Sequence, residues 1–453
     1  MGNRVVGTAR RVFKWDYKMD PRIAWLSPMP PAPTGIASYS QAVLDGLRRI
    51  GYTPAKHAIE PIWPVRSRHE GQIPWYTMGV YHLGNNVGFH RDIYRHAIQS
   101  PGLVVIHDLA LDDFVRGMIA AGDPLGHQAL REGVASAPRL AMMQFDEPLT
   151  TPYVAHVARR ARGILVHSPF VERYLRAFGC RTPVYVAPHP VVERWAAIER
   201  ARQHRAATRA PLEAHGMCTL VGVFGDLNAS KLIDVVLAAI RQLDPSVHLA
   251  LVGRRIEAHD VEAWVRGSGL GESERVTLRT DVPDDDFLRW MAAADIAIDL
   301  RSPHRGEVSG SLARAMQVGL PTLVSDTGTY RDLPDELVFK VPAGRPEPRE
   351  IANALRTLIE HPDRARSIGA AAQAHMQQLD RSERTAHVYA EAIEGTLALL
   401  ADPTRRALSR WAGALADLGI TEEDLRSGYG AGYARALDEF AAAPPTAAAA
   451  DDR

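Results

Sequence analysis

The sequence lacks three features that would narrow its class at once: cysteines in number, an excess of charge of one sign, and a long apolar run. It contains two cysteines, Cys180 and Cys218, which are too few for a disulfide framework or a cysteine-based zinc site. Lys plus Arg equal Asp plus Glu at 53 each, so the chain has no broad positive field of the kind that nucleic-acid-binding proteins use. We therefore expect no nucleic-acid partner and a reducing, cytoplasmic environment.

The apolar stretches are all short. None approaches the roughly 20 residues that span a bilayer, and the N-terminus has no apolar signal core. Residues 1–20 do mix basic residues with aromatic and aliphatic ones, which suits contact with an anionic membrane surface. A frayed arm is the reading that we favour for this segment. We expect a cytoplasmic protein, with peripheral contact at the inner membrane surface as a second option.

Two folded domains follow from length and pattern. The chain has 453 residues, of which 46% are hydrophobic and 23% charged, so it is globular in composition and too long for one core. Short β-branched runs alternate with longer helical patterns, which is typical of parallel sheets with crossover helices. The runs form two series, at 22–28, 103–109, 163–168 and 184–188, and then at 219–225, 248–253, 275–280, 296–300 and 321–326.

The predicted fold class is α/β, with two doubly wound, Rossmann-like parallel-sheet domains facing a central cleft. Ligands of such folds bind at the carboxyl ends of the strands. The predicted division is an N-terminal arm (1–20), an N-terminal Rossmann-like domain (21–190), a linker without strand pattern (191–216), a C-terminal Rossmann-like domain (217–385), C-terminal helices packing back on the N-terminal domain (386–440) and a low-complexity, disordered tail (441–453). One stretch, 352–379, is helical by period.

The segment 298–334 carries the strongest chemical signal. In it a strand ends, a Gly/Ser-rich turn follows and a helix begins near Ser309. Ser309 suits a helix cap, Gly310 lets a ligand approach the backbone, and the free N–H groups with the helix dipole favour a diphosphate. Arg301 and Arg305 add positive charge beside the turn. An ordinary capped helix after a loop is the alternative, and the turn by itself does not decide between them.

The same segment resembles the donor-binding core of family 4 glycosyltransferases, which have the GT-B architecture. In particular it is similar to a bacterial branch with Gly-Glu-Thr/Val-Ser-Gly-Ser-Leu at this place. The matching residues are Gly306-Glu307-Val308-Ser309-Gly310-Ser311-Leu312, Arg314-Ala315-Met316, Gly319-Leu320-Pro321 and Ser325-Asp326-Thr327-Gly328. The resemblance implies transfer of a sugar from a nucleoside diphosphate with retention of configuration, without a metal and without a cofactor.

The resemblance extends to the turn and helix at 222–240. Lys231 matches the family's lysine, and the resemblance implies that its ammonium neutralises the departing diphosphate. Asp226 stands where the family has an arginine. We expect another cation to take over that contact, with Arg254 and Arg301 as candidates, unless each of them merely pairs with a nearby carboxylate.

The family's pair of glutamates falls on Gly306 and Arg314 in this chain, while Glu307 is displaced by one position. The resemblance implies that Glu307 contacts the transferred sugar and that Arg314 lies where the family recognises the ribose. The residues implied to line the diphosphate are Val308, Ser309, Gly310 and Ser311. Val282, in the loop after the strand run 275–280, matches the family's base-contacting region.

The first half contributes two further candidates. The loop and helix start within 27–52 resemble the family's first strand-to-helix loop, which leans over the donor phosphates. Gly35 and Ile36 lie at its turn, and Gly35 gives access to the backbone. His107 directly follows a strand run and resembles the family's histidine beside the reacting sugar. A buried histidine with a satisfied hydrogen bond is the alternative for this residue.

No metal is expected. The acidic run at 284–286 starts a helix, where carboxylates suit the dipole, and Asp112-Asp113 lack supporting ligands. The sequence therefore predicts a retaining, metal-independent glycosyltransferase with a UDP- or GDP-linked donor. Its acceptor is a hydroxyl of a sugar, a lipid-linked molecule or a small molecule, in polysaccharide, glycolipid or natural-product biosynthesis. A GT-B sugar-nucleotide epimerase and a non-catalytic nucleotide-sugar-binding protein are the alternatives.

Overall fold

The computed structural model describes residues 22–53, 57–64, 76–140, 149–192, 195–256, 259–271 and 273–401. The chain divides into two compact units, Met1–Glu394 and Gly395–Arg453. The predicted arm at 1–20, the helices expected beyond 401 and the tail at 441–453 lie outside the described residues. The first unit contains both sheets and all of the candidate site residues.

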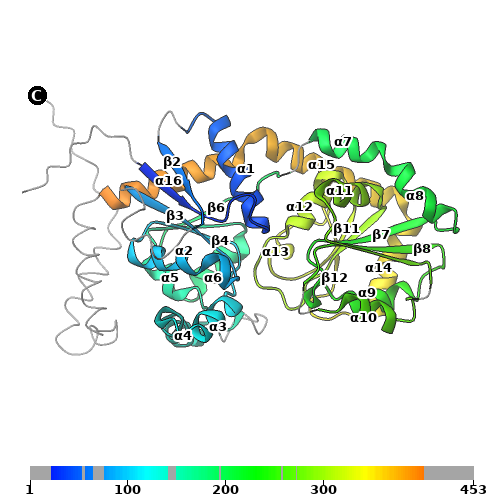
Figure 1. Ribbon diagram of the computed structural model, residues 1–453, viewed down its shortest axis with the longest axis horizontal. Coiled ribbons are helices and arrows are strands. Elements are labelled where there is room, and N and C mark those ends of the chain that lie inside the picture. The colour runs from blue at the N-terminus through cyan, green and yellow to red at the C-terminus, as the bar shows by residue number, and fades with distance from the viewer. Residues whose placement is uncertain are drawn as a thin grey trace, which may run out of the picture. The chain divides into compact units, whose positions relative to one another are not determined.

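The first sheet is parallel throughout and has the strand order β2-β1-β3-β4-β5-β6 (Figure 1). Its strands are β1 (Arg22–Leu26), β2 (Ala58–Ile62), β3 (Met78–Leu83), β4 (Leu103–Ile106), β5 (Gly163–Val166) and β6 (Val184–Val186). Its helices are α1 (Gly35–Arg49), α2 (Val87–Gln99), α3 (Asp112–Ala120), α4 (Pro124–Ser136), α5 (Ala155–Arg160) and α6 (Pro169–Ala177).

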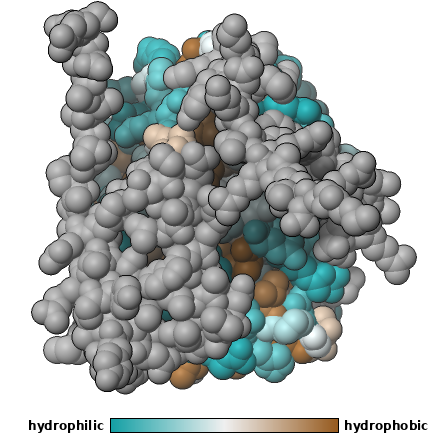
Figure 2. All heavy atoms as spheres, turned by 90° about the vertical axis from the view of Figure 1, so that its left-hand side faces the viewer, coloured by the Kyte–Doolittle hydropathy of each residue, from teal (hydrophilic) through white to brown (hydrophobic). Residues whose placement is uncertain are grey.

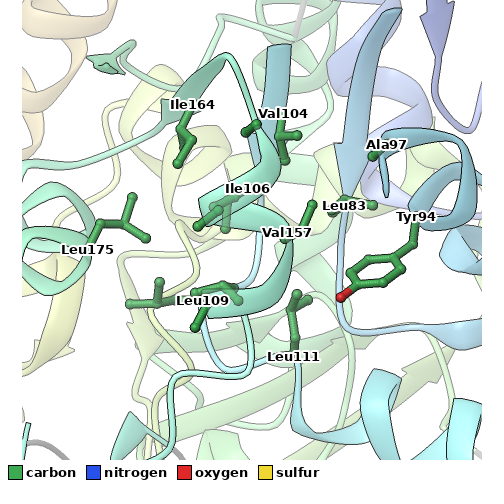
Figure 3. Packing of buried hydrophobic residues seen from close by; sticks show 14 of the residues in the cluster. Leu83, Tyr94, Ala97, Val104, Ile106, Leu109, Leu111, Val157, Ile164 and Leu175 are labelled. Carbon is green, nitrogen blue, oxygen red and sulfur yellow. The ribbon is translucent and has the colours of Figure 1, made fainter. Parts of the chain in front are cut away.

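The neighbouring strands β4 and β5 are apolar along their whole length because helices cover both faces of the sheet. Figure 3 shows Val104 and Ile106 of β4 beside Ile164 of β5, with Tyr94 of α2 and Leu175 of α6 packed around them. All of these side chains are buried. Because the strands are parallel, their carboxyl ends lie at the same edge of the sheet.

The second sheet is also parallel and has the order β12-β11-β10-β7-β8-β9. Its strands are β7 (Thr219–Phe224), β8 (Val247–Gly253), β9 (Val276–Thr280), β10 (Ile296–Asp299), β11 (Thr322–Ser325) and β12 (Phe339–Val341). The remaining helices are α7 (Trp195–Gln203), α8 (Arg205–Glu213), α9 (Ile233–Ile240), α10 (Val261–Gly267), α11 (Asp284–Ala293), α12 (Gly310–Val318), α13 (Gly328–Arg331), α14 (Pro348–Glu360), α15 (Pro362–Ser382) and α16 (Arg384–Ala401).

Each predicted strand run is a strand in the structure, and three strands were not predicted. The edge strand β2 contains Pro61 and is largely exposed, so it has neither an apolar run nor a continuous ladder of donors. β3, Met-Gly-Val-Tyr-His-Leu, is buried but poor in β-branched residues. β12 has only three residues. In all three cases the tertiary setting, and not local propensity, makes the strand.

Two predicted segments differ from the structure in detail. The stretch 352–379 is not one helix, because α14 ends before Pro362 and α15 begins there. The ring of Pro362 restricts His361, which has φ −120° and ψ 66° outside the helical region. The stretch 191–216 is more than a linker, since it contains α7 and α8. Ile198 and Ala201 of α7 are buried against the second sheet and its helices, which we call the second half of the chain; the first sheet and its helices are the first half.

Within the described residues, no helix is both long and apolar enough to cross a membrane. Figure 2 shows one face of the molecule, where the visible described residues mix hydrophilic and hydrophobic side chains.

Candidate active site

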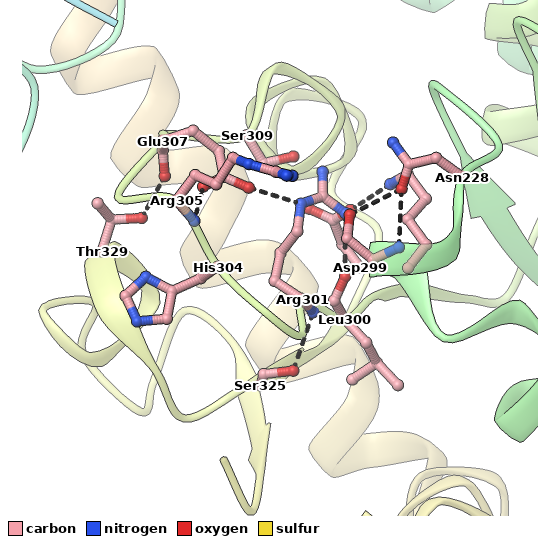
Figure 4. A network of polar contacts seen from close by, with 12 residues as sticks. Asn228, Asp299, Leu300, Arg301, His304, Arg305, Glu307, Ser309, Ser325 and Thr329 are labelled. Carbon is pink, nitrogen blue, oxygen red and sulfur yellow. Dashed lines mark hydrogen bonds and ion pairs between the residues drawn. The ribbon is translucent and has the colours of Figure 1, made fainter. Parts of the chain in front are cut away.

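A buried carboxylate lies at the carboxyl edge of the second sheet. Asp299 is the last residue of β10, between β7 and β11, and is 3% exposed. Its Oδ1 lies 2.6 Å from Nζ of Lys231 and 3.2 Å from Nη1 of Arg301. The hydroxyl of Tyr330 donates to its Oδ2 at 2.8 Å. Asp299 therefore joins two cations that come from different loops (Figure 4).

The charges of this cluster persist at neutral pH. Burial lowers the pKa of Lys231 to about 8, with Arg301 acting in the same direction against the attraction of Asp299. Burial opposes ionisation of Asp299, but Arg301 and Lys231 outweigh it and hold the pKa of that carboxyl well below its usual value. Both partners are therefore ionised at pH 7, and the pair is sealed from water.

Lys231 precedes the helix and is held by a tight turn. The 3₁₀ turn Ala229–Lys231 is capped by Asn228, whose side chain accepts a hydrogen bond from the Ser230 N–H at 3.1 Å. Leu232 follows with a positive φ of 53°, and α9 starts at Ile233. The lysine side chain is 1% exposed, so its ammonium has a single fixed direction, toward Asp299.

Glu307 is committed to two partners. Its Oε1 accepts from Nε of Arg301 at 3.1 Å, and its Oε2 accepts from the backbone N–H of Arg305 at 2.6 Å. The hydroxyl of Thr329 donates to its carbonyl at 2.7 Å. Figure 4 shows this carboxylate beside the Arg301 guanidinium, so Glu307 and Asp299 hold that guanidinium between them.

The start of α12 has the serine cap and the open backbone at Gly310 that the sequence predicted. Ser309 is the N-cap, and its Oγ accepts from the N–H of Leu312 at 3.2 Å. A Cβ added to Gly310 would meet no atom within 4 Å, so the backbone there faces open space. The N–H groups of a first helical turn lack intrahelical acceptors and attract anions. The adjacent Val308 and Ser311 are partly buried and belong to the same turn and helix start.

The turn after β7 packs tightly against this helix start. Gly225 has φ +95°, and a Cβ added to it would lie 2.3 Å from Oγ of Ser311. A Cβ added to Gly253, at the end of β8, would lie 1.7 Å from the carbonyl oxygen of Gly225. These glycines let the turn that leads to Lys231 approach α12 closely.

Asp226 and Arg254 form a two-pronged ion pair. Nε and Nη2 of Arg254 lie 3.0 and 2.7 Å from the two carboxylate oxygens of Asp226. Nη1 of the same guanidinium donates to the carbonyl of Pro33 at 2.5 Å. Arg254 is thus paired with the residue that replaced the expected arginine, and Arg301 is paired with Asp299. Both arginines that were candidates to replace the missing cation are therefore paired with a carboxylate in this structure, as the alternative interpretation predicted.

Two predicted residues, Val282 and Arg314, make their contacts away from this charge cluster. Val282 packs at the margin of a hydrophobic cluster that includes Phe287. The guanidinium carbon of Arg314 lies 5.4 Å from the centre of the Phe287 ring, and Nη1 lies 3.8 Å from Asp284. Arg314 therefore faces α11, and its ribose role stays a prediction.

The loop after β1 ends in a capped helix start. Thr34 is the N-cap of α1, and its Oγ1 accepts from the N–H of Ile36 at 3.4 Å. A Cβ added to Gly35 would meet nothing within 4 Å. The preceding Pro33 carbonyl accepts from Arg254, so this loop contacts the second half at the residue paired with Asp226.

A second contact joins the halves near His107. The backbone N–H groups of Leu109 and Ala110 donate to the carbonyl of Arg305 at 3.0 and 3.1 Å. The Arg305 side chain lies 3.1 Å from Asp112 and 3.3 Å from Asp113. This accounts for the acidic pair, which serves as an anchor for Arg305. Among the residues that the structure describes, no group of three or more His, Cys, Asp or Glu is arranged to hold a metal.

Four histidines lie along the carboxyl edge of the first sheet. His82 lies in β3, His107 follows β4, His167 follows β5 and His189 follows β6. The rings of His107, His167 and His189 lie 4.6, 5.0 and 5.3 Å from that of Tyr39. The sequence pointed to His107, whereas His82 was missed because β3 was not predicted. The signal available was a histidine near the end of each successive strand.

This histidine cluster predicts acid sensitivity. Burial lowers the pKa of His167 to about 3 and of His189 to about 4, against about 6.5 in an unfolded chain. The unfolded state binds more protons below that value, so stability is fully present above about pH 6.5 and is lost as pH falls toward about 4. We expect each of these two histidines to lower the free energy of unfolding by up to about 1.4 kcal/mol per pH unit in this window. Urea unfolding across the window measures it, and His167→Gln should flatten the slope. A slope that does not change in the variant would contradict this account.

Comparison with known proteins finds a glycosyltransferase likeness in the part of the chain that contains the second sheet. Residues 218–361 match the family model described as glycosyl transferases group 1. Over 129 residues the chain is 30% identical to D-inositol 3-phosphate glycosyltransferase of Thermobispora bispora. That stretch makes up 28% of this chain and 29% of that protein, so the match spans under a third of the curated relative.

Solved structures extend the likeness to both halves. Sucrose-phosphate synthase from Thermosynechococcus elongatus superposes with a TM-score of 0.57 at 19% identity, covering 83% of this chain and 99% of that one. HepE from Anabaena, in complex with UDP-glucose, gives a TM-score of 0.53 at 17% identity with the same coverage of 83% and 99%. The catalytic domain of starch synthase IV from Arabidopsis thaliana, bound to ADP and acarbose, gives 0.52 at 14%, again covering 83% and 99%. The two parallel six-stranded sheets and these neighbours show a two-domain α/β fold of the GT-B type.

Proposed function

We propose that this protein is a glycosyltransferase that moves a sugar from a nucleoside diphosphate to a hydroxyl acceptor. The observation that carries the proposal is the meeting of Lys231, Arg301 and the start of α12 at one edge of the second sheet. This edge falls within the segment that matches glycosyl transferases group 1. Cations and free N–H groups at such an edge suit a diphosphate. We further assign the chain to family 4, on its resemblance at 306–328.

The proposed transfer retains configuration and needs no protein nucleophile. The bond between the anomeric carbon and the diphosphate oxygen breaks, and the acceptor oxygen bonds to that carbon on the same face. The acceptor's proton passes to the departing phosphate. Lys231 and Arg301 stabilise the negative charge that develops on that phosphate, which is a preorganised electrostatic contribution. Glu307, next to Arg301, is proposed to contact the transferred sugar.

Donor binding provides the first test. Calorimetric titration of the full chain with UDP, GDP and their common sugar conjugates should reveal one preferred nucleotide sugar. Incubation of that donor with sugar, lipid-linked and small-molecule acceptors should then yield a glycosylated product. Interconversion of the donor sugar without transfer would favour an epimerase, and binding without any turnover would favour a non-catalytic protein. Either result would overturn the proposal.

Turnover is expected to survive chelation. We propose that the enzyme uses neither a metal nor a cofactor, because cations of the protein stand where a divalent ion would neutralise the diphosphate. Initial rates with and without EDTA should agree within experimental error. The control is a metal-dependent glycosyltransferase assayed in the same buffer. Loss of activity in EDTA that a divalent ion restores would contradict the proposed electrostatics.

A further inference from the structure

One hydrogen bond links two histidines at the edge of the first sheet. Nδ1 of His82 lies 3.0 Å from Nε2 of His107. His82 belongs to β3 and is 0% exposed, whereas His107 follows the neighbouring strand β4 and is only partly buried. Burial and the neighbouring histidines lower the pKa of both rings well below the usual value. Each ring therefore carries one proton at neutral pH, and that proton has two possible places.

The surroundings of His82 decide between them. Its other ring nitrogen, Nε2, is sealed from solvent and has no partner among the described residues. If His107 donated to His82, the single proton of His82 would lie on that sealed nitrogen. Buried N–H groups without an acceptor are rarer in proteins than buried acceptors without a donor. The favoured arrangement therefore has Nδ1–H of His82 donating to Nε2 of His107.

Neighbouring histidines show the same arrangement independently. Nδ1 of His90 faces the carbonyl of His82, Nδ1 of His167 faces that of Ala187, and Nδ1 of His189 faces that of Pro190. A carbonyl oxygen only accepts, so each of these three rings carries its proton on Nδ1. Nε2 of His167 is sealed and unpartnered among the described residues, like that of His82. The cluster as a whole is built from neutral Nδ1–H rings.

The proton of His107 follows from this. Because its Nε2 accepts from His82, its own proton lies on Nδ1. No described residue is hydrogen-bonded to that Nδ1, and the atom is not among the ring nitrogens sealed from solvent. His107 therefore offers an N–H group, and not a lone pair, to whatever occupies the space beside it. Its neighbour Asp108 is partly buried and accepts from the backbone N–H of Asn85 at 2.8 Å.

We propose that His82 is a positioning residue that holds His107 as the Nδ1–H tautomer, so that His107 serves the transfer as a hydrogen-bond donor and not as a base. The catalytic half of this inference rests on the proposed function, whereas the tautomer does not. A donating His107 agrees with a transfer in which the acceptor's proton leaves with the phosphate. It would bond to an oxygen of the nucleotide sugar.

The tautomer is measured directly by long-range ¹H–¹⁵N spectra of the full chain labelled with ¹⁵N-histidine. The signals of His107 are identified by their loss in His107→Gln. We expect a protonated Nδ1 and a bare Nε2 for His107 in the parent protein. In His82→Phe, which keeps a flat ring between Trp25 and Tyr389, His107 should move to Nε2–H or to a mixture.

Two further variants separate the hydrogen bond from the packing. His82→Asn places an amide N–H where Nδ1 stands and should retain the parental tautomer of His107. His167→Phe is the matched control, because His167 is also buried and lies 5.0 Å from the His107 ring without sharing a hydrogen bond with it. If His82→Phe does not fold, His82→Gln replaces it, since its amide lies at the other ring nitrogen's position.

Kinetics with the donor found by calorimetry complete the test. In His82→Phe we expect kcat to fall about 10²-fold and donor affinity to fall much less, because a histidine in the wrong tautomer loses most of its catalytic effect. His82→Asn should recover most of the loss. An unchanged His107 spectrum in His82→Phe would overturn the inference, and a changed tautomer with parental kcat would overturn its catalytic half. The expected spectra in a chain that turns over no donor would support the tautomer and overturn only the proposed function.

Discussion

Replacing Lys231 with Met is expected to lower kcat by about 10²–10³-fold, the usual cost of removing one preorganised partner of a developing negative charge. Met keeps the length of the buried side chain and deletes the charge that lies 2.6 Å from Asp299. Donor affinity should fall less than kcat, because the start of α12 and Arg301 are also proposed to bind the diphosphate in the ground state. Transfer kinetics and calorimetric donor binding on the same preparation measure both quantities.

A second variant distinguishes lost catalysis from lost folding. Lys231→Met alone leaves Asp299 buried with one cation fewer, which typically destabilises a protein by about 3–5 kcal/mol. Combining it with Asp299→Asn removes the uncompensated charge and should restore much of the stability. The double variant should stay slow, since the ammonium is still absent. Parental kcat in either folded variant would remove Lys231 from the proposed mechanism.

Gly253→Ala is expected to destabilise the second half by about 3 kcal/mol or more, since overpacking against backbone cannot relax by a rotamer change. The new Cβ would lie 1.7 Å from the carbonyl oxygen of Gly225, so the ends of β7 and β8 must separate. That separation displaces the turn leading to Lys231, and donor binding should weaken together with stability. Chemical denaturation and donor calorimetry report the two effects.

Gly267→Ala is the matched control. Gly267 ends α10, and a Cβ added there would meet nothing within 4 Å. Replacing a helical glycine with alanine typically stabilises by about 0.5–1 kcal/mol. The two alanine variants should therefore shift the denaturation midpoint in opposite directions. A Gly253→Ala protein as stable as its parent would show that the strand ends are not packed as described.

Local signals were enough to predict the fold class, which the structure confirms. Each predicted strand run ended at polar or proline residues, and Ser309 marked the start of α12 because an N-cap is encoded by one side chain and its neighbours. β2 and β3 were missed because their own residues have weak strand signals, and pairing with the neighbouring strands stabilises them. Pro362 broke a predicted helix that period alone had made continuous.

The sequence predicted which residues belong to the candidate site, but not which of them contact one another. The sequence placed Lys231, Arg301 and Glu307 in the donor region, but it did not show that Asp299 joins the first two or that Glu307 holds the second. Those contacts depend on β10 lying between β7 and β11, which is a property of the sheet. The roles of these residues in catalysis stay predictions.

Each cationic side chain described near the candidate donor site is paired with a carboxylate, and this pairing affects how a donor can bind. Lys231 and Arg301 face Asp299, Arg254 faces Asp226, and Arg305 faces Asp112 and Asp113. Under the proposed function, a diphosphate that binds here must replace carboxylates that already accept hydrogen bonds from these cations. Such an exchange favours a ligand whose shape matches the site over one that offers charge alone. A simple anion that bonds to one guanidinium gains little that the carboxylate did not already provide. Under the proposed function we therefore expect inorganic phosphate and high salt to compete weakly at this site, and an effective inhibitor to carry two linked phosphates.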